Sequence, residues 1–236
     1  MQCITAANPN TVVLLNAGGN VDMSKWIDKV PALLHLWYAG QEGGTAVAEM
    51  LFGKVNPSGK LPVSFEKKWE DNPAYPYYYD TDGDKRVEYK EGLFMGYRHY
   101  DISDTKPQFA FGYGLSYTTF KYSDLRINRE KGKDLAVKVR FTVKNTGKYD
   151  GAETAQVYIR PVNPKVERPY KELKGFAKHF IRKNAGQEME ITLNKDAFSY
   201  YKTDLKDFDY DAGSYEVLVG SASDDIRLRK VIQIEK

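Results

Sequence analysis

Two carboxylates that lie close together in the sequence, Glu88 and Glu91, are the first candidates for chemistry in this chain. Most glycosidases use a pair of carboxylates, one as general acid and one as nucleophile or base. Retaining enzymes hold the two carboxyl groups about 5–5.5 Å apart across the bound sugar, whereas carboxylates this close on one segment usually point to solvent. We therefore predict that neither is catalytic, and we assign no catalytic residue from the sequence.

Asp80, Asp82 and Asp84 surround Gly83 and offer oxygen ligands at the alternate positions that calcium loops use. Glu91 stands where such a loop carries its last ligand. However, the glycine comes two positions earlier than in an EF-hand loop, and no flanking helices are evident. A solvated loop is therefore the favoured interpretation, and a calcium site is the alternative.

The histidines are scattered along the chain. Arg98, His99 and Asp101 have the residue types of a charge relay, but no motif places a serine or cysteine beside them, so we expect an interface network. His35 lies inside an apolar run and is expected to be buried and hydrogen-bonded, while His179 is isolated in a strand-like segment. Such an arrangement does not make a metal site, and we expect neither a metal nor a cofactor.

The remaining candidates, Gln41 and Glu42, follow a continuous apolar run at residues 33–37 that is typical of a strand covered on both faces. Residues 45–52 then carry apolar side chains on one helical face, and Gly53 stands where a left-handed helix cap is expected. Ligands of open α/β sheets collect beyond the carboxyl ends of strands, so Gln41 and Glu42 are candidate substrate-binding residues. The alternative for Glu42 is a structural role at the start of the helix.

A turn and a second strand complete this α/β pattern. Residues 56–59, Asn-Pro-Ser-Gly, have the chemistry of a turn, and residues 61–65 are predicted to form a strand. Pro62 limits that strand to an edge of the sheet or to its first positions. The fold class predicted for the first part of the chain is therefore an open α/β sheet.

The pattern of apolar residues changes near residue 122, from continuous runs to strict alternation. Alternation with a period of two is typical of strands with one buried and one wet face. About seven short strands separated by turn residues predict an all-β sandwich of immunoglobulin or fibronectin type III kind. The positions predicted to be buried are Leu135, Val137, Val139, Phe141, Val143, Ala155, Val157, Ile159, Met189, Ile191, Leu193, Tyr215, Val217, Val219, Ile226, Leu228, Ile232 and Ile234.

Composition narrows the possible partners. The chain of 236 residues has a net charge of +3, which gives no sign of a nucleic-acid partner, and no apolar run is long enough for a membrane helix. Residues 1–10 have neither a basic segment nor a long apolar core, so no signal peptide is expected there. The single cysteine, Cys3, excludes an internal disulfide and leaves the cellular compartment open.

Several motifs together resemble the C-terminal third of glycoside hydrolase family 3, the β-glucosidase and β-xylosidase group. The segment TVVLLNAGGNVDMSKW at 11–26 resembles the strand that follows the family's acid/base loop. The other motifs occur in the family's order along nearly the whole chain: GQEGG at 40–44, NPSGKLPVSF at 56–65, YKEGLFMGYRHYD at 89–101, FAFGYGLSYTTF at 109–120 and RPYKELKGFAK at 168–178.

The resemblance implies part of the family's α/β sandwich domain at 1–106, a linker at 107–122 and a fibronectin type III-like domain at 123–236. It also implies a parent enzyme that hydrolyses β-linked sugars with retention, and whose barrel and two catalytic carboxylates lie upstream of Met1. This chain would supply scaffold and part of a subsite wall and would be inactive alone. Its expected partners are the barrel-bearing portion of the parent or a second copy of itself, and a carbohydrate substrate. The alternative is a noncatalytic module that binds carbohydrate or protein.

Overall fold

The computed structural model describes residues 1–130 and 135–236, which form two compact units. The first unit comprises residues 1–55 and 63–110, and the second comprises residues 56–62 and 111–236. The short segment 56–62 thus belongs to the second unit, although both of its flanks belong to the first. The domain boundaries given by the sequence stay a prediction.

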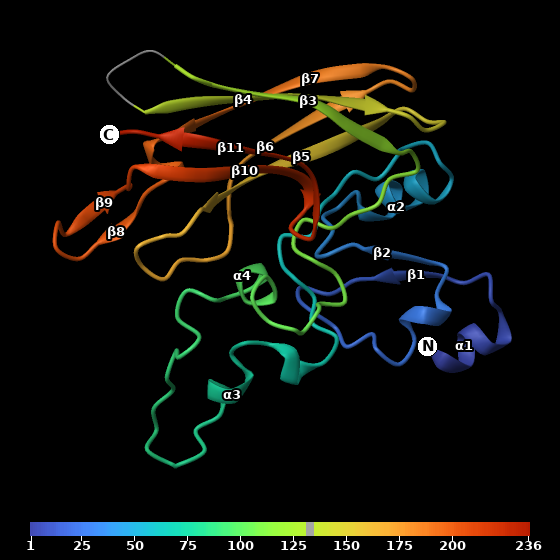
Figure 1. Cartoon of the computed structure of the whole chain (residues 1–236). Helices are drawn as coiled ribbons and strands as arrows, with labels where there is room; N and C mark the ends of the chain where they lie inside the picture. The colour runs from blue at the N-terminus through green and yellow to red at the C-terminus, as the bar shows by residue number, and fades with distance from the viewer. Residues whose placement is uncertain (131–134) are drawn as a thin grey trace. The chain divides into compact units, whose positions relative to one another are not determined.

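The first unit has an α/β core built on two parallel strands, β1 and β2 (Figure 1). Val12 pairs with Ala32 and Leu15 pairs with His35. The structure thus contains the strand implied by the family resemblance within 11–26 and the strand predicted from the apolar run at 33–37, which ends earlier than predicted, at His35. Nowhere along the described residues does the chain have a helix with the length and apolar character needed to span a bilayer. The elements of this unit are α1 (Gln2–Ala7), β1 (Val12–Leu15), η1 (Ile27–Lys29), β2 (Ala32–His35), α2 (Gly43–Leu51), η2 (Trp69–Asp71), α3 (Tyr75–Tyr78) and α4 (Tyr97–Tyr100).

Helix α2 ends as the sequence predicted. Gly53 has a φ of 72°, in the left-handed region, and its N–H donates to the carbonyl of Met50 at 3.0 Å. The next amide, from Lys54, donates to the carbonyl of Glu49 at 2.8 Å, so two of the last carbonyls of the helix are satisfied. A glycine takes this backbone conformation without the steric cost that a side chain would add.

The strand predicted at residues 61–65 is wrong: these residues, all within the described part of the chain, form no strand. Phe65 makes only an isolated bridge with Phe109, in which its N–H donates to the Phe109 carbonyl at 2.8 Å. Pro62 has no N–H to donate, so a continuous ladder cannot pass through it. Phe65 is buried, but Val63 is 40% exposed and Ser64 is buried, so the apolar pattern of this segment was insufficient to predict a strand.

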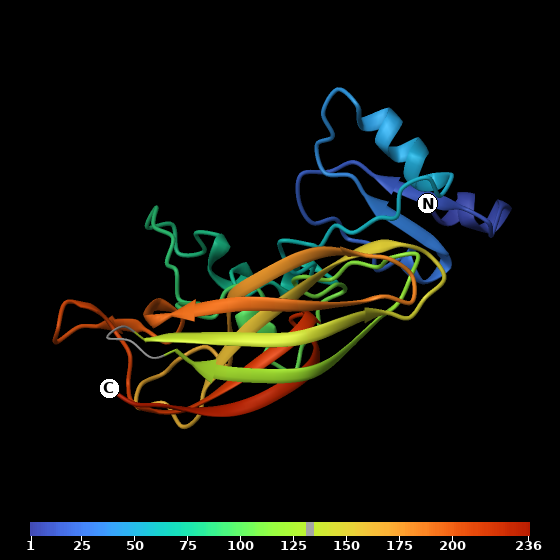
Figure 2. The same ribbon diagram turned by 90° about the horizontal axis from the view of Figure 1, so that it is seen from above.

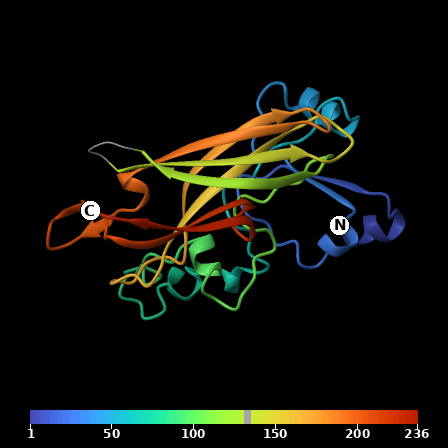
Figure 3. The same cartoon turned by 45° about the horizontal axis from the view of Figure 1, so that its top comes forward.

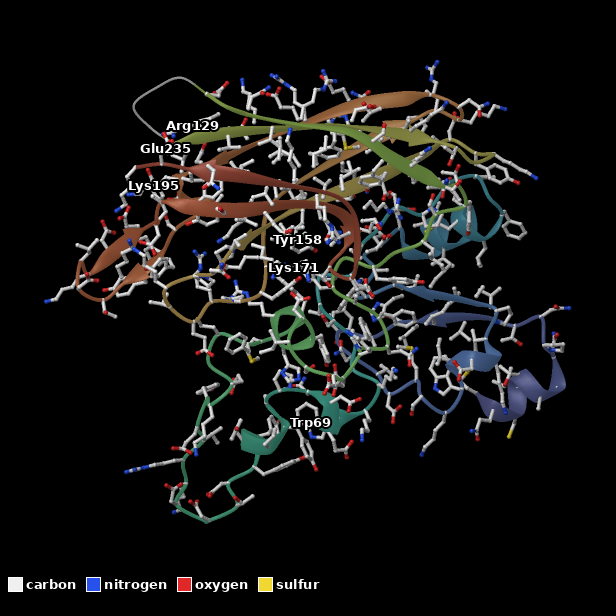
Figure 4. The ribbon with its side chains drawn as sticks, in the orientation of Figure 1. Trp69, Arg129, Tyr158, Lys171, Lys195 and Glu235 are labelled. Carbon is white, nitrogen blue, oxygen red and sulfur yellow. The ribbon has the colours of Figure 1, made fainter. Side chains whose placement is uncertain are left out.

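The aromatic stretch after residue 66 packs on itself. The ring of Trp69, labelled in Figure 4, meets those of Tyr75 and Tyr78 edge to face, with centroids 5.7 and 5.3 Å apart. Edge-to-face contacts are a favoured geometry of aromatic pairs. The short helices η2 and α3 therefore form around a local aromatic cluster.

The second unit is a β-sandwich, which confirms the predicted fold class (Figures 1, 2 and 3). Within the described residues, one sheet has the strand order β11-β10-β5-β6 and the other the order β3-β4-β7, while β8 and β9 form a separate hairpin. The strands are β3 (Phe120–Arg129), β4 (Ala136–Asn145), β5 (Gly151–Pro161), β6 (Glu172–Ile181), β7 (Gly186–Asn194), β8 (Tyr200–Lys202), β9 (Asp207–Asp209), β10 (Gly213–Ala222) and β11 (Asp225–Ile234), with η3 (Lys195–Ala197) after β7.

The core lies between the two sheets and contains the positions that the alternation predicted on β4, β5, β7 and β10. On β11, Ile234 is buried, whereas Ile226, Leu228 and Ile232 are only partly buried. Strand β11 lies at the edge of its sheet, where one side has no neighbouring strand to cover it. The alternation therefore identified the side chains that face the core. How deeply each side chain is buried depends on the position of its strand in the sheet.

Several ion pairs lie at the end of the sandwich that contains the C-terminus. The guanidinium of Arg129 lies 4.0 Å from the carboxylate of Glu235, and both are labelled in Figure 4. The carboxylate of Asp209 accepts from the ammonium of Lys236 at 2.6 Å and lies 3.3 Å from that of Lys195. The hydrogen bond from Lys236 is the main reason that the pKa of Asp209 lies below its usual value.

Candidate functional site

Gln41 and Glu42 lie in the loop between β2, which ends at His35, and α2, which begins at Gly43. Both side chains are exposed. The Glu42 carboxylate accepts a hydrogen bond from the Thr45 hydroxyl at 3.0 Å, and Glu42 immediately precedes α2. This contact fits the structural role that the sequence left open, and it leaves the substrate-binding role as a proposal.

The carboxylates of Asp80, Asp82 and Asp84 come together in an exposed loop, with ligand atoms within 4.8 Å of one another. Asp80 accepts from the backbone N–H groups of Gly83 at 2.7 Å and Lys85 at 2.9 Å. The N–H of Lys85 is the main reason that the pKa of Asp80 is lowered. The Asp80 side chain thus stabilises the turn by accepting hydrogen bonds from its backbone, which is a common role of aspartate in turns.

Glu88 forms an ion pair with the ammonium of Lys90, and both side chains are largely exposed. The same ammonium lies 5.8 Å from the centre of the Tyr77 ring. These contacts raise the pKa of Lys90, with Glu88 as the main cause. Glu88 is therefore engaged with a neighbouring cation on the surface.

Arg98 and His99 lie on the short helix α4, and Asp101 follows it. Burial lowers the pKa of His99, so its imidazole is neutral over more of the physiological range. The neighbouring Tyr100 hydroxyl donates to the carbonyl of Asp71 at 3.2 Å, and burial raises the pKa of Tyr100 to about 12. The segment is thus packed into its unit.

His35 is partly buried at the end of β2. Its Nδ1 accepts from the N–H of Trp37 at 3.2 Å, and its ring centre lies 4.2 Å from that of Trp37 and 5.4 Å from that of Phe65. Burial lowers the pKa of His35. The imidazole therefore packs against two aromatic rings but is less buried than the sequence predicted.

The second unit contains a cavity of about 500 Å³, lined by both apolar and charged side chains, that the sequence did not predict. The ammonium of Lys60 donates to the carbonyl of Gly114 at 3.1 Å and lies 3.6 Å from the Glu153 carboxylate. The other oxygen of Glu153, which lies on β5, accepts from the hydroxyl of Tyr122 at 2.8 Å. Burial lowers the pKa of Lys60 and raises that of Tyr122. Lys60 and Glu153 both line the cavity, and we call this pair its floor.

The hairpin of β10 and β11 supplies another wall of the cavity. Arg227 donates to the Asp225 carboxylate at 2.7 Å and to the carbonyl of Phe120 at 2.9 Å, and its guanidinium lies 4.8 Å from the centre of the Tyr122 ring. The hydrogen bond from Arg227 is the main cause of the lowered pKa of Asp225. Hydrogen-bond donors and acceptors therefore line a space that is open to solvent.

The cavity also depends on a close backbone approach. A Cβ on Gly114 would lie 2.2 Å from the carbonyl oxygen of Gly59, so only glycine lets the two segments meet. The N–H of Leu61 donates to the carbonyl of Tyr113 at 2.8 Å and extends this contact. The sequence predicted a turn at residues 56–59, but it did not predict which segment this turn contacts.

Two family matches cover most of the chain. Residues 1–117 match the glycosyl hydrolase family 3 C-terminal domain, and residues 153–223 match the fibronectin type III-like domain. An α/β lobe joined to a β-sandwich, with both parts matched in this order, defines the C-terminal region of a glycoside hydrolase.

Individual relatives agree with the family matches. The chain is 43% identical over 235 residues to thermostable β-glucosidase B of Acetivibrio thermocellus, covering 99% of this chain and 31% of that protein. It is 42% identical to a β-glucosidase of Kluyveromyces marxianus, covering 100% of this chain and 28% of that protein. The chain therefore belongs to glycoside hydrolase family 3, as its C-terminal region, and it spans less than a third of the length of these relatives.

Solved structures of the family have the same fold. The crystal structure of the Kluyveromyces marxianus β-glucosidase in complex with glucose has a TM-score of 0.92 at 41% identity, and the match covers 100% of this chain and 28% of that one. The structure of β-glucosidase 3B of Thermotoga neapolitana in complex with glucose has a TM-score of 0.87 at 36% identity, with 95% and 31% covered. The resemblance stated from the sequence motifs is confirmed.

Proposed function

We propose that this chain is the C-terminal part of a retaining β-glucosidase or β-xylosidase, in which it acts as a scaffold beside the catalytic barrel. The observation that carries this proposal is the match of 43% identity along 99% of the chain to a β-glucosidase. The two catalytic carboxylates of such an enzyme would come from the portion of the parent that precedes this chain.

Gln41 and Glu42 are proposed to form part of a subsite wall. They are exposed beyond the carboxyl end of a parallel strand, which is where ligands of open α/β sheets bind. An amide offers both donors and acceptors and a carboxylate offers acceptors, so together they can bind sugar hydroxyls. The bond between Glu42 and Thr45 would hold that carboxylate in one orientation.

A chimera tests the proposed function. We expect the purified chain alone to leave aryl β-glucosides uncleaved, because retaining hydrolysis needs a nucleophile and an acid/base that the parent's upstream portion would supply. The chain should restore hydrolysis when it replaces the matching region of the Kluyveromyces marxianus β-glucosidase. In that chimera Gln41→Ala or Glu42→Ala should raise KM several-fold.

Release of nitrophenol is the measurement, and the same chimera with Asp204→Asn, an exposed change in the turn between β8 and β9, is the control. A well-folded chimera without activity would contradict the scaffold role. Hydrolysis by the isolated chain that disappears in Glu42→Gln would instead make Glu42 catalytic.

We also propose that the chain associates through the lobe that carries β1. A parallel sheet is normally covered on both faces, yet Val12 and Leu14 on β1 are 48% and 41% exposed. Unpaired strand edges and exposed apolar side chains favour association with another chain. The proposed partner is the barrel-bearing portion of the parent, or otherwise a second copy of this chain.

Sedimentation velocity is expected to show dimers of the isolated chain, or a stable complex when the barrel-bearing portion is added as a separate polypeptide. Val12→Lys combined with Leu14→Lys should weaken this association, because the charges oppose burial of the strand face. A monodisperse monomer that remains monomeric after addition of the barrel-bearing portion would refute the proposal.

A further inference from the structure

We propose that the cavity in the second unit is a binding site for a neutral monosaccharide or a short neutral oligosaccharide. The site is built from Lys60 and Glu153 at its floor, Arg227 and Asp225 at one wall, and Leu115 at its rim. This proposal goes beyond the scaffold function, because it gives the fibronectin-like unit a ligand of its own.

The floor of the cavity is the ion pair of Lys60 and Glu153, whose separation is longer than that of an ordinary hydrogen bond. Glu153 is only 4% exposed, and its Oε2 lies 3.6 Å from Nζ of Lys60, beyond the 2.7–3.2 Å of ordinary N–H···O bonds. Besides this ion pair, the Tyr122 hydroxyl donates to the other oxygen of Glu153, and Lys60 donates to the carbonyl of Gly114. An ammonium has three donors and a carboxylate has about four acceptor positions, so the pair retains capacity for a ligand.

A hydroxyl group matches this pair. It can donate its proton to Oε2 of Glu153 and accept a hydrogen bond from Nζ of Lys60 at the same time. Hydrogen bonds with one charged member are about twice as strong as neutral ones, and the low exposure of Glu153 reduces competition from water. A polyol, which carries many such hydroxyls, is thus the favoured chemical class.

The charges around the cavity favour a neutral ligand. Among the described residues that line it, two side chains are cationic, Lys60 and Arg227, and three are carboxylates, Glu153, Asp224 and Asp225. Arg227 is committed to Asp225 and to the carbonyl of Phe120. The carboxylates would repel an anionic ligand, and Lys60 and Arg227 would repel a simple cation.

The size and the apolar part of the wall also fit a sugar ring. Ligand pockets of proteins commonly measure about 300–1,000 Å³, and this cavity of about 500 Å³ lies within that range. Tyr113, Leu115 and Phe120 line it, and Leu115 is 73% exposed at the rim. Apolar side chains can cover the C–H face of a pyranose while the polar floor binds its hydroxyls.

Titration of the full chain with D-glucose and with cellobiose tests the site. We expect saturable chemical-shift changes of the backbone amides of Gly114, Ser116 and Asp224, which line the cavity. Inorganic phosphate, the anionic probe, should leave these amides unchanged. Tighter binding of phosphate than of both sugars, or the absence of saturable changes with either sugar, would overturn the proposal.

Matched variants test whether the sugar binds at the floor and the rim of the cavity. Glu153→Gln keeps the shape of the side chain and removes its charge, and it should weaken glucose binding about tenfold. Leu115→Ala, at an exposed position that does not threaten folding, should weaken binding several-fold. Asp204→Asn, outside the cavity, should leave it unchanged. Unaltered affinity in folded Glu153→Gln, or in Leu115→Ala if the first variant does not fold, would overturn the assignment.

Discussion

Replacing Phe141 with alanine is expected to lower the free energy of unfolding by about 3–5 kcal/mol, because a large side chain would leave a cavity in a close-packed core. Phe141 lies on β4, the central strand of its sheet, and is fully buried. Its ring stacks on that of Tyr122, with centroids 6.2 Å apart and nearly parallel planes. The truncation would remove this contact together with the buried apolar area.

Lys138→Ala is the matched control on the opposite face of the same strand. The Lys138 side chain is 28% exposed and pairs with Glu130 and Glu190 at the surface. Surface ion pairs contribute little, so we expect a change within about 0.5 kcal/mol. Denaturant unfolding of both variants provides the measurement, and equal midpoints would show that the face assigned to the core is wrong.

Replacing Asn145 with alanine is expected to cost about 2–5 kcal/mol, although the change removes only a small polar side chain. Asn145 is fully buried at the end of β4. Its amide donates to the carbonyls of Tyr149 at 2.8 Å and Ile181 at 3.0 Å. Its oxygen accepts from the hydroxyl of Thr118 at 2.7 Å and from the N–H of Gly147 at 3.1 Å. Each buried group left without a partner costs about 1–3 kcal/mol.

Thr146→Ala provides the control at the next position. Thr146 is exposed, and its side chain bonds only to Thr119 across the turn among the described residues. We expect this change to cost less than about 1 kcal/mol. Chemical denaturation of the two variants compares them directly, and a loss for Asn145→Ala as small as that for Thr146→Ala would show that water replaces the lost hydrogen bonds.

Some features of the fold follow from local rules and could be predicted. The alternation along Leu135 to Val143 has the period of a strand, so it identified the buried face before any partner strand was known. Gly53 was predicted as a helix cap because its position after an apolar helical face needs a left-handed backbone. Both features depend on neighbours within a few residues.

Other features failed or were missed because they depend on distant segments. Residues 61–65 had a strand-like pattern, but pairing also needs donors and a partner in register, and Pro62 lacks the donor. The candidate site of the second unit brings together Lys60, Glu153 and Arg227, which are far apart in the sequence. No rule of sequence spacing connects these three residues, so local motifs could not predict that they lie together.

The sequence alone determined the family, the two fold classes and the inward face of the sandwich strands. Motif order and apolar periodicity are properties of consecutive residues, so they can be recognised without knowing any tertiary contact. Only the tertiary structure decided that segment 56–62 belongs to the second unit and that Lys60 forms an ion pair with Glu153 in the lining of a cavity. The physical reason is that a buried charge is stable only beside a partner, and the fold selects that partner from anywhere along the chain.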